Sequence, residues 1–393
     1  MKKTLTLGLL AAAIASSGMA HAEDTKIAFL GGFTGPLESL TPPIYAGAKL
    51  AIDQVNAQGG NITLLKGDST CADATAASNV ADRMVNSEKV VALVGPMCSG
   101  ATIAAANNAA IPGGVTLISP SATSPALTDL NDNDLGYRTA PSDAYQGVMM
   151  ANMLMAKGIN EVAITYVNND YGKGFAEALE AAYTKAGGSV AANEAHEDGK
   201  ADYRAELGSL ASSGAETLVV LAYADGSGQT IIRQAMESGD FAKFVGGDGM
   251  VGDKLIGALG GDVDMIATKP GSPELAGKAP FVEAAKAAGM DPDAVFSAQA
   301  YDAAFIIALA IEKAGSADRA AVAKEIRSVA SAPGEEILPG EFDKAVAAIK
   351  AGKDVNYQGA SGNHEFDAAG DVPGVIVEMA IKDGQFVEMG VLK

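Results

Sequence analysis

Small hydroxyl side chains follow two apolar runs in this sequence, residues 90–94 and 115–118. Ser99 comes after the first run and opens an Ala-rich segment, whereas Ser121 and Thr123 come after the second run. Short β-branched runs predict strands buried on both faces, and the Ala-rich segment predicts a helix. The two strand ends would present hydroxyl groups side by side, one of them at a helix N-terminus, where free N–H groups favour a carboxylate or a phosphate. A simple helix cap at Ser99 is the alternative interpretation.

Strand and helix signals alternate over most of the chain, starting at Lys26. Each strand–helix unit takes about 30 residues, which is typical of parallel, doubly wound α/β sheets. Polar segments at residues 119–141, 268–273 and 356–364 interrupt this pattern, and we interpret each as a crossing between two lobes.

The crossings divide the chain into two lobes with a cleft between them. We predict an α/β protein with two doubly wound parallel-sheet (Rossmann-like) lobes joined by a three-stranded hinge. The N-terminal lobe would contain residues 23–141 and 271–358, and the C-terminal lobe residues 142–270 and 359–393.

The first 22 residues have the features of a secretion signal. Lys2 and Lys3 form a basic start, residues 5–15 are apolar, and Ala20-His21-Ala22 is an A-x-A cleavage site. The apolar stretch is too short to span a bilayer, and no later run reaches about 18 uninterrupted apolar residues. We therefore expect residues 1–22 to be a signal peptide and the protein to be exported and soluble.

The charge balance excludes several classes of partner. The chain carries 48 acidic residues against 28 Lys and Arg, a formal net charge of −20. Such an acidic surface repels nucleic acid and anionic lipid. We therefore expect no nucleic-acid binding. A hydrophobic content of 48% without any Trp indicates an Ala/Val/Ile-rich α/β core rather than disorder.

Two cysteines and few histidines limit the metal and redox chemistry available. A lone pair such as Cys71 and Cys98 usually forms a disulfide in an exported chain, and two buried free thiols are the alternative. After removal of the signal peptide only His196 and His364 remain, and we expect both in polar loops. We therefore expect neither a metal site nor a cofactor.

Signatures of common enzymes are missing from the sequence. It contains no P-loop G-x-x-x-x-G-K-[ST], no G-x-S-x-G elbow, no H-E-x-x-H zinc motif and no C-x-x-C. The prediction is a protein that is not an enzyme.

Taken together, a set of short fragments resembles the periplasmic leucine/isoleucine/valine-binding proteins, which are type I substrate-binding proteins of ABC importers. The resemblance runs over essentially the whole chain after the signal peptide, and the order and spacing of the fragments make it specific. The fragments are residues 34–36, 46–56, 68–71, 98–99, 119–123, 170–174, 246–249 and 301–304.

The resemblance implies a binding site for a zwitterionic ligand. The hydroxyl and amide groups of Ser99 and Thr123 would hold the ligand's carboxylate, and Ser121 and Thr123 would help to hold its ammonium. Asp248 would bind the ammonium from the opposite lobe. The other implied ligand-binding residues are Ala122, Tyr171, Tyr223, Leu40 and Phe296, and the resemblance also implies that Cys71 is bonded to Cys98.

Taken without the resemblance, several of these residues have simpler interpretations. Tyr171 and Tyr223 each follow a predicted strand and would serve equally well as ordinary half-buried tyrosines. Asp248 lies between glycines and would suit a turn. The chain also departs from the family pattern: Asp248 replaces a longer Glu, Leu40 replaces an aromatic, and Glu38 adds a charge nearby.

The expected function is that of a periplasmic solute-binding protein of an ABC importer. It would capture a small, aliphatic branched-chain amino acid by hinge closure and deliver it, as a monomer, to the permease subunits. The alternatives are the same fold with another small solute (an amide, a urea-like compound or an aromatic acid), an extracellular hydrolase, or a receptor domain that feeds a sensor. A ligand without an ammonium group would leave Asp248 unpaired, so the pairing of Asp248 distinguishes an amino acid from these other solutes.

Overall fold

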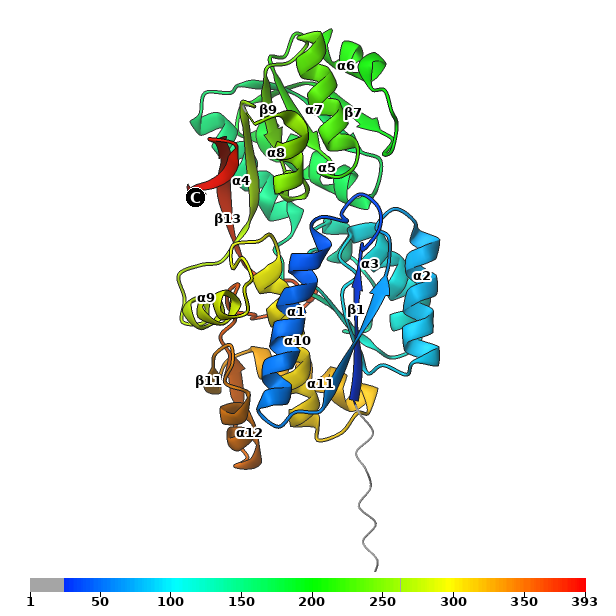
Figure 1. Ribbon diagram of the computed structural model, residues 1–393, viewed down its shortest axis with the longest axis vertical. Helices are drawn as coiled ribbons and strands as arrows, with labels where there is room; N and C mark the ends of the chain where they lie inside the picture. The colour runs from blue at the N-terminus through cyan, green and yellow to red at the C-terminus, as the bar shows by residue number, and fades with distance from the viewer. Residues whose placement is uncertain (1–24, 262) are drawn as a thin grey trace, which may run out of the picture.

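Two sheets with helices packed on their faces organise the chain into two lobes, one above the other in Figure 1. The computed structural model describes residues 25–261 and 263–393. The predicted signal peptide, residues 1–22, lies outside the described residues. The predicted α/β fold class is confirmed.

The first sheet has five strands, all parallel, in the order β2-β1-β3-β4-β5. Side chains of β1, an interior strand, alternate between two buried faces: Ile27 and Phe29 lie on one face, Ala28 and Leu30 on the other. Burial on both faces explains why these strands read as continuous apolar runs. The strands are β1 (Thr25–Gly31), β2 (Ile62–Asp68), β3 (Ala92–Val94), β4 (Thr116–Ser119) and β5 (Gly136–Arg138).

The second sheet has seven strands in the order β14-β13-β10-β9-β8-β6-β7. The five strands from β10 to β7 are parallel, and the two last strands of the chain add an antiparallel edge. The strands are β6 (Glu161–Val167), β7 (Ser189–His196), β8 (Thr217–Leu221), β9 (Lys243–Gly246), β10 (Met265–Gly271), β13 (Val375–Lys382) and β14 (Gln385–Val391). A separate parallel pair joins β11 (Glu335–Ile337) to β12 (Val355–Tyr357).

Helices cover both sheets, and the longest of them is the most deeply buried. The segment 297–310 of α10 is buried throughout, because this helix lies inside its lobe alongside α1 and is apolar on nearly all sides (Figure 1). The α-helices are α1 (Thr41–Ala57), α2 (Ala74–Asp82), α3 (Ser99–Ala105), α4 (Asp143–Ala156), α5 (Asp170–Lys185), α6 (Arg204–Ala211), α7 (Ser227–Ser238), α8 (Asp253–Leu259), α9 (Lys278–Ala287), α10 (Ser297–Ala314), α11 (Arg319–Ala330) and α12 (Phe342–Lys350). Short π and 3-10 turns are η1 (Arg83–Ser87), η2 (Ala106–Ala110), η3 (Pro125–Leu127) and η4 (Asp248–Met250).

The buried carboxylate of Asp302 on α10 holds the start of the last crossing between the lobes. It accepts hydrogen bonds from the Tyr357 hydroxyl at 2.6 Å and from the N–H groups of Ala360 and Ser361, both at 2.8 Å. The Ser361 hydroxyl donates a fourth bond. A charged acceptor with four donors fixes this segment firmly against the helix.

Three local predictions from the sequence are wrong. Residues 268–271 belong to β10 rather than to an irregular crossing, because they pair with β13 and the polar side chains of Thr268 and Lys269 are buried inside the fold. The segment 119–141 contains the short strand β5, which closes the edge of the first sheet. Both histidines are buried rather than set in polar loops: His196 ends β7 and bonds to Thr165 and Ser227, and His364 lies 3.5 Å from Asp302.

Candidate functional site

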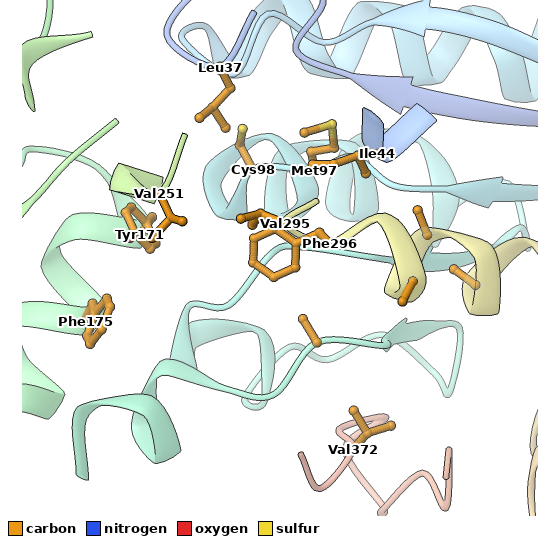
Figure 2. Packing of buried hydrophobic residues seen from close by; sticks show 14 of the residues in the cluster. Leu37, Ile44, Met97, Cys98, Tyr171, Phe175, Val251, Val295, Phe296 and Val372 are labelled. Atoms are coloured by element: carbon orange, nitrogen blue, oxygen red, sulfur yellow. The ribbon is translucent and has the colours of Figure 1, made fainter. Parts of the chain in front are cut away.

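A pocket of about 360 Å³ lies where the two lobes face each other. The lobe of the first sheet contributes an apolar wall, and the lobe of the second sheet contributes tyrosines and a carboxylate. Figure 2 shows Met97, Cys98, Ile44 and Phe296 on one side and Tyr171 on the other. The lining residues are Leu37, Leu40, Ile44, Met97, Cys98, Ser99, Ser121, Tyr171, Tyr223, Asp248, Gly249 and Phe296.

The two predicted hydroxyl-bearing strand ends do meet at this pocket. Strands β3 and β4 are neighbours, so the loops that follow them run side by side. Ser99 is the first residue of α3, and the N-cap is Cys98, so the interpretation of Ser99 as a simple cap is wrong. The Ser99 hydroxyl accepts the N–H of Ser124 at 3.2 Å, and the Ser121 hydroxyl donates to the carbonyl of Met97 at 3.0 Å.

Ala122 and Thr123 lie directly behind the wall of the pocket. Both are fully buried, and neither lines the cavity itself. The Thr123 hydroxyl has no hydrogen-bond partner of normal geometry in the described part of the chain, but it lies close enough to the Asp143 carboxyl to lower the pKa of that group. A buried hydroxyl without a partner is uncommon, and here it lies next to the two serines of the wall.

The opposite wall is built from two stacked tyrosines and Asp248. The rings of Tyr171 and Tyr223 are stacked with centroids 5.3 Å apart. The Tyr171 hydroxyl donates to Asp248 Oδ1 at 3.4 Å and accepts the N–H of Gly249 at 3.3 Å. A Cβ at Gly249 would approach the Ala222 carbonyl to 2.6 Å, so glycine is needed there for this close contact.

Asp248 is a buried carboxylate in an unfavourable environment. Its side chain receives a bond from Gln146 Nε2 at 3.1 Å, and no Lys or Arg of residues 25–261 and 263–393 forms an ion pair with it. Burial raises the pKa of Asp248 to about 6, against the opposing effect of its hydrogen bonds. The interpretation of Asp248 as a plain turn residue does not account for this burial.

Sequence reasoning missed Asp143 and Gln146, one turn apart on the same face of α4. Both side chains are fully buried in a helix that is otherwise mostly apolar. Gln146 Nε2 bonds Asp248, and also the carbonyl and hydroxyl of Thr268 at 3.1 Å. Burial, together with the charge of Asp248, raises the pKa of Asp143 well above its usual range. Two polar residues at i and i+3 in an apolar helix were the signal that could have revealed them.

The predicted disulfide between Cys71 and Cys98 is confirmed. The two Cα atoms are 5.5 Å apart, and the bridge joins the loop after β2 to the N-terminus of α3. Because Cys98 lines the pocket, the disulfide also holds part of its wall in place. Glu38, by contrast, is exposed and does not line the pocket.

Within the described ranges, no three His, Cys, Asp or Glu side chains gather as metal ligands would. No helix among the described residues is both long and apolar enough to span a lipid bilayer.

The fold and the site define a two-lobed protein with a solute pocket between its lobes. The chain belongs to the periplasmic binding protein family, whose model matches residues 24–345. The resemblance seen in the sequence and the type I periplasmic binding fold are thereby confirmed.

Relatives of known specificity are similar over most of their length. A leucine-, isoleucine-, valine-, threonine- and alanine-binding protein of Pseudomonas aeruginosa is 35% identical over 341 residues, which are 84% of this chain and 90% of that protein. The crystal structure of the leucine binding protein LivK of Thermotoga maritima has a TM-score of 0.79 at 26% identity and covers 94% of this chain and 99% of its own. LivJ of Streptococcus pneumoniae, solved with isoleucine, has a TM-score of 0.76 at 26% identity and covers 93% of this chain and 100% of its own.

Proposed function

We propose that this protein captures a small, aliphatic branched-chain amino acid between its lobes and delivers it to the permease of an ABC importer. The observation that carries the proposal is Asp248, a buried pocket carboxylate with no ion pair to a described residue. A buried charge is tolerable when it is paired and hydrogen-bonded. The α-ammonium group of an amino acid would supply the missing positive charge.

The carboxylate of the ligand would face the other wall. Ser99 accepts a bond from Ser124, so its own hydroxyl hydrogen is free to donate. The first N–H groups of α3 have no partner inside the helix, and the Thr123 hydroxyl is a further donor behind the wall. Neutral donors opposite Asp248 therefore suit a zwitterion.

The remaining lining is apolar and suits an aliphatic side chain. Leu37, Leu40, Ile44, Met97 and Phe296 surround the space from the first lobe. Burying a Val, Leu or Ile side chain is worth roughly 1.5–3 kcal/mol, whereas a second buried charge without a partner would cost several. The specificities printed in the names of the relatives support the same ligand class.

Closure of the lobes would enclose the ligand. We propose that residues 23–141 with 271–358 and residues 142–270 with 359–393 move as the two bodies of a hinge, a motion for which periplasmic binding proteins are a standard example. After removal of residues 1–22 the protein would act in the periplasm as a monomer and dock on the permease. Its role is binding rather than catalysis, and an amide, urea-like or aromatic-acid ligand would leave Asp248 unpaired.

A thermal-shift screen against the standard amino acids tests this function, followed by calorimetry on the ligands that shift the melting temperature. Leucine at about a hundredfold excess over Kd should stabilise the native state by about 2.7 kcal/mol. Two matched compounds sharpen the test: 4-methylpentanoate lacks only the ammonium group, and 3-methylbutylamine lacks only the carboxylate. Both should bind far more weakly than leucine. Equal binding of 4-methylpentanoate would contradict the role of Asp248.

A further inference from the structure

Asp143 is a buried carboxyl group that the proposed binding site does not use. It lies at the start of α4, is fully buried and does not line the pocket. Neither of its oxygens has a hydrogen-bond partner of normal geometry among the residues that the structure describes, although the nearby Thr123 hydroxyl lowers its pKa. Leaving an ionised carboxylate in this state is strongly unfavourable.

The geometry of α4 places Asp143 beside Asp248. Gln146 Nε2 reaches Asp248 Oδ1 at 3.1 Å, and Asp143 lies one turn earlier on the same helical face. The Asp143 N–H donates to the carbonyl of Thr123 at 2.8 Å, which ties the start of α4 to the hydroxyl-bearing strand end. Two carboxyl groups therefore lie close together in a buried region.

The neighbouring charges leave this pair without a close counter-ion. Arg138 attracts Asp143 from β5, but its guanidinium is already bonded to Asp371 and to the carbonyls of Thr123 and Ser124. The tyrosines from the opposite elements are neutral at physiological pH, because burial raises the pKa of the Tyr171 and Tyr223 hydroxyl groups. Strand β10 contributes only the hydroxyl and carbonyl of Thr268.

We propose that Asp143 and Asp248 form an acid pair that carries one proton in the unliganded protein and releases it to solvent when the ligand's ammonium group binds. Two buried carboxyl groups that interact closely share their protons as a unit. An ammonium beside Asp248 replaces the proton as the positive charge, so the pair ionises. Asp143 is thus a positioning residue that acts through Asp248, and this inference rests on the proposed function.

Few other groups could supply the proton in the neutral range. Burial lowers the pKa of His196 to about 4 and lowers the pKa of His364 below its usual value. Both shifts favour the neutral imidazole, so neither histidine is an obvious source of protons at neutral pH. A free amino acid keeps both of its charges over the same range. Proton release in this window would therefore come from the pair.

Calorimetry of leucine binding in buffers of different ionisation enthalpy measures the protons released. The wild type should release up to about one proton per leucine near neutral pH, and its affinity should rise by up to about tenfold per pH unit over the same window. Asp143→Asn should still bind leucine, with its proton release and pH slope strongly reduced above about pH 7, where Asp248 by itself, with a pKa of about 6, is already ionised. If Asp143→Asn folds poorly, Asp143→Ser replaces it, and the same reduction in proton release and pH slope is expected.

Asp253→Asn is the control, since it removes an exposed carboxylate at the start of α8 that the proposed site does not use. Its proton release should equal that of the wild type. Leucine binding without proton release in the wild type, or unchanged release in Asp143→Asn, would overturn the inference. Failure of leucine to bind at any pH would instead contradict the proposed function.

Discussion

The carboxylate of Asp225 accepts two hydrogen bonds from Ser39 across the cleft, one from the backbone N–H at 2.7 Å and one from the hydroxyl at 2.8 Å. Ser39 immediately precedes Leu40 and α1 in the first lobe, and Asp225 lies between β8 and α7 in the second. Neither residue lines the pocket. This contact therefore joins the lobes without a ligand and favours the closed arrangement over an open one.

Removing the contact between Asp225 and Ser39 should lower the affinity for every ligand by a similar factor. We expect Asp225→Ala to raise Kd by about tenfold or more, because hydrogen bonds to a charged group contribute about 1.5–3 kcal/mol and the loss acts on closure. Calorimetry with leucine and a weaker ligand measures this. Lys254→Met is the control: the lysine is exposed and its ion pair with Asp225 is long, at 3.4 Å, so its loss should change Kd by less than about fivefold. If the change in Kd caused by Asp225→Ala differs between ligands, Asp225 would contribute to ligand specificity rather than to closure of the lobes.

Replacing Asp248 should weaken binding much more than folding. We expect Asp248→Asn to raise the Kd for leucine by roughly 30-fold to several-thousand-fold, since losing one partner of a desolvated charge pair costs about 2–5 kcal/mol. Calorimetry gives the affinity and circular dichroism the melting temperature. The exposed Asp253→Asn serves as the matched control and should leave both unchanged. Unaltered affinity in Asp248→Asn would move the ammonium site elsewhere.

The raised pKa of Asp248 makes the stability of the unliganded protein depend on pH. A carboxyl group with a pKa of 3.8 when unfolded and about 6 when folded binds its proton more tightly in the folded state. Its contribution to stability is therefore lost as the pH rises from about 4 to about 6. Denaturation of wild type and Asp248→Asn across this range should show the variant gaining on the order of 2 kcal/mol relative to the wild type. A constant difference between the two proteins would contradict the assigned shift.

The pocket should prefer aliphatic over charged ligands. We expect leucine, isoleucine or valine to bind at least about tenfold more tightly than aspartate, lysine or arginine, because the apolar wall offers no partner for a second charge. A competition assay against bound leucine measures the ratio. Since Glu38 is exposed, Glu38→Gln should not change it. Displacement of leucine by lysine at equal concentration would mean that Glu38 turns inward.

The disulfide between Cys71 and Cys98 should stabilise the whole protein. The cysteines are 27 residues apart, and closing a loop of this size is worth roughly 3–4 kcal/mol in the chain-entropy model. We expect a lower melting temperature for Cys71→Ser/Cys98→Ser than for the wild type, and an equal one once the wild type is reduced. Thiol labelling of the denatured, unreduced wild type should find no free cysteine.

The architecture and one wall of the pocket could be predicted from the amino-acid sequence. Apolar runs such as residues 90–94 and 115–118 report buried strands because local composition reflects burial on both faces. The hydroxyl residues Ser99 and Ser121 follow those strands directly, so their meeting at one sheet edge was predictable from chain order. The pairing of Cys71 with Cys98 followed from the even count, the export signal and the family resemblance.

The partner of each buried polar residue depends on how distant elements pack and could not be predicted from the sequence. Asp143 and Gln146 are polar positions in the mostly apolar helix α4, but only the packing of α4 against η4 and β10 places them beside Asp248. The contact of Ser39 with Asp225 joins residues 186 positions apart and depends on how the lobes close. Burial and long-range charge arise when distant segments exclude water from the same region, and no local pattern encodes that.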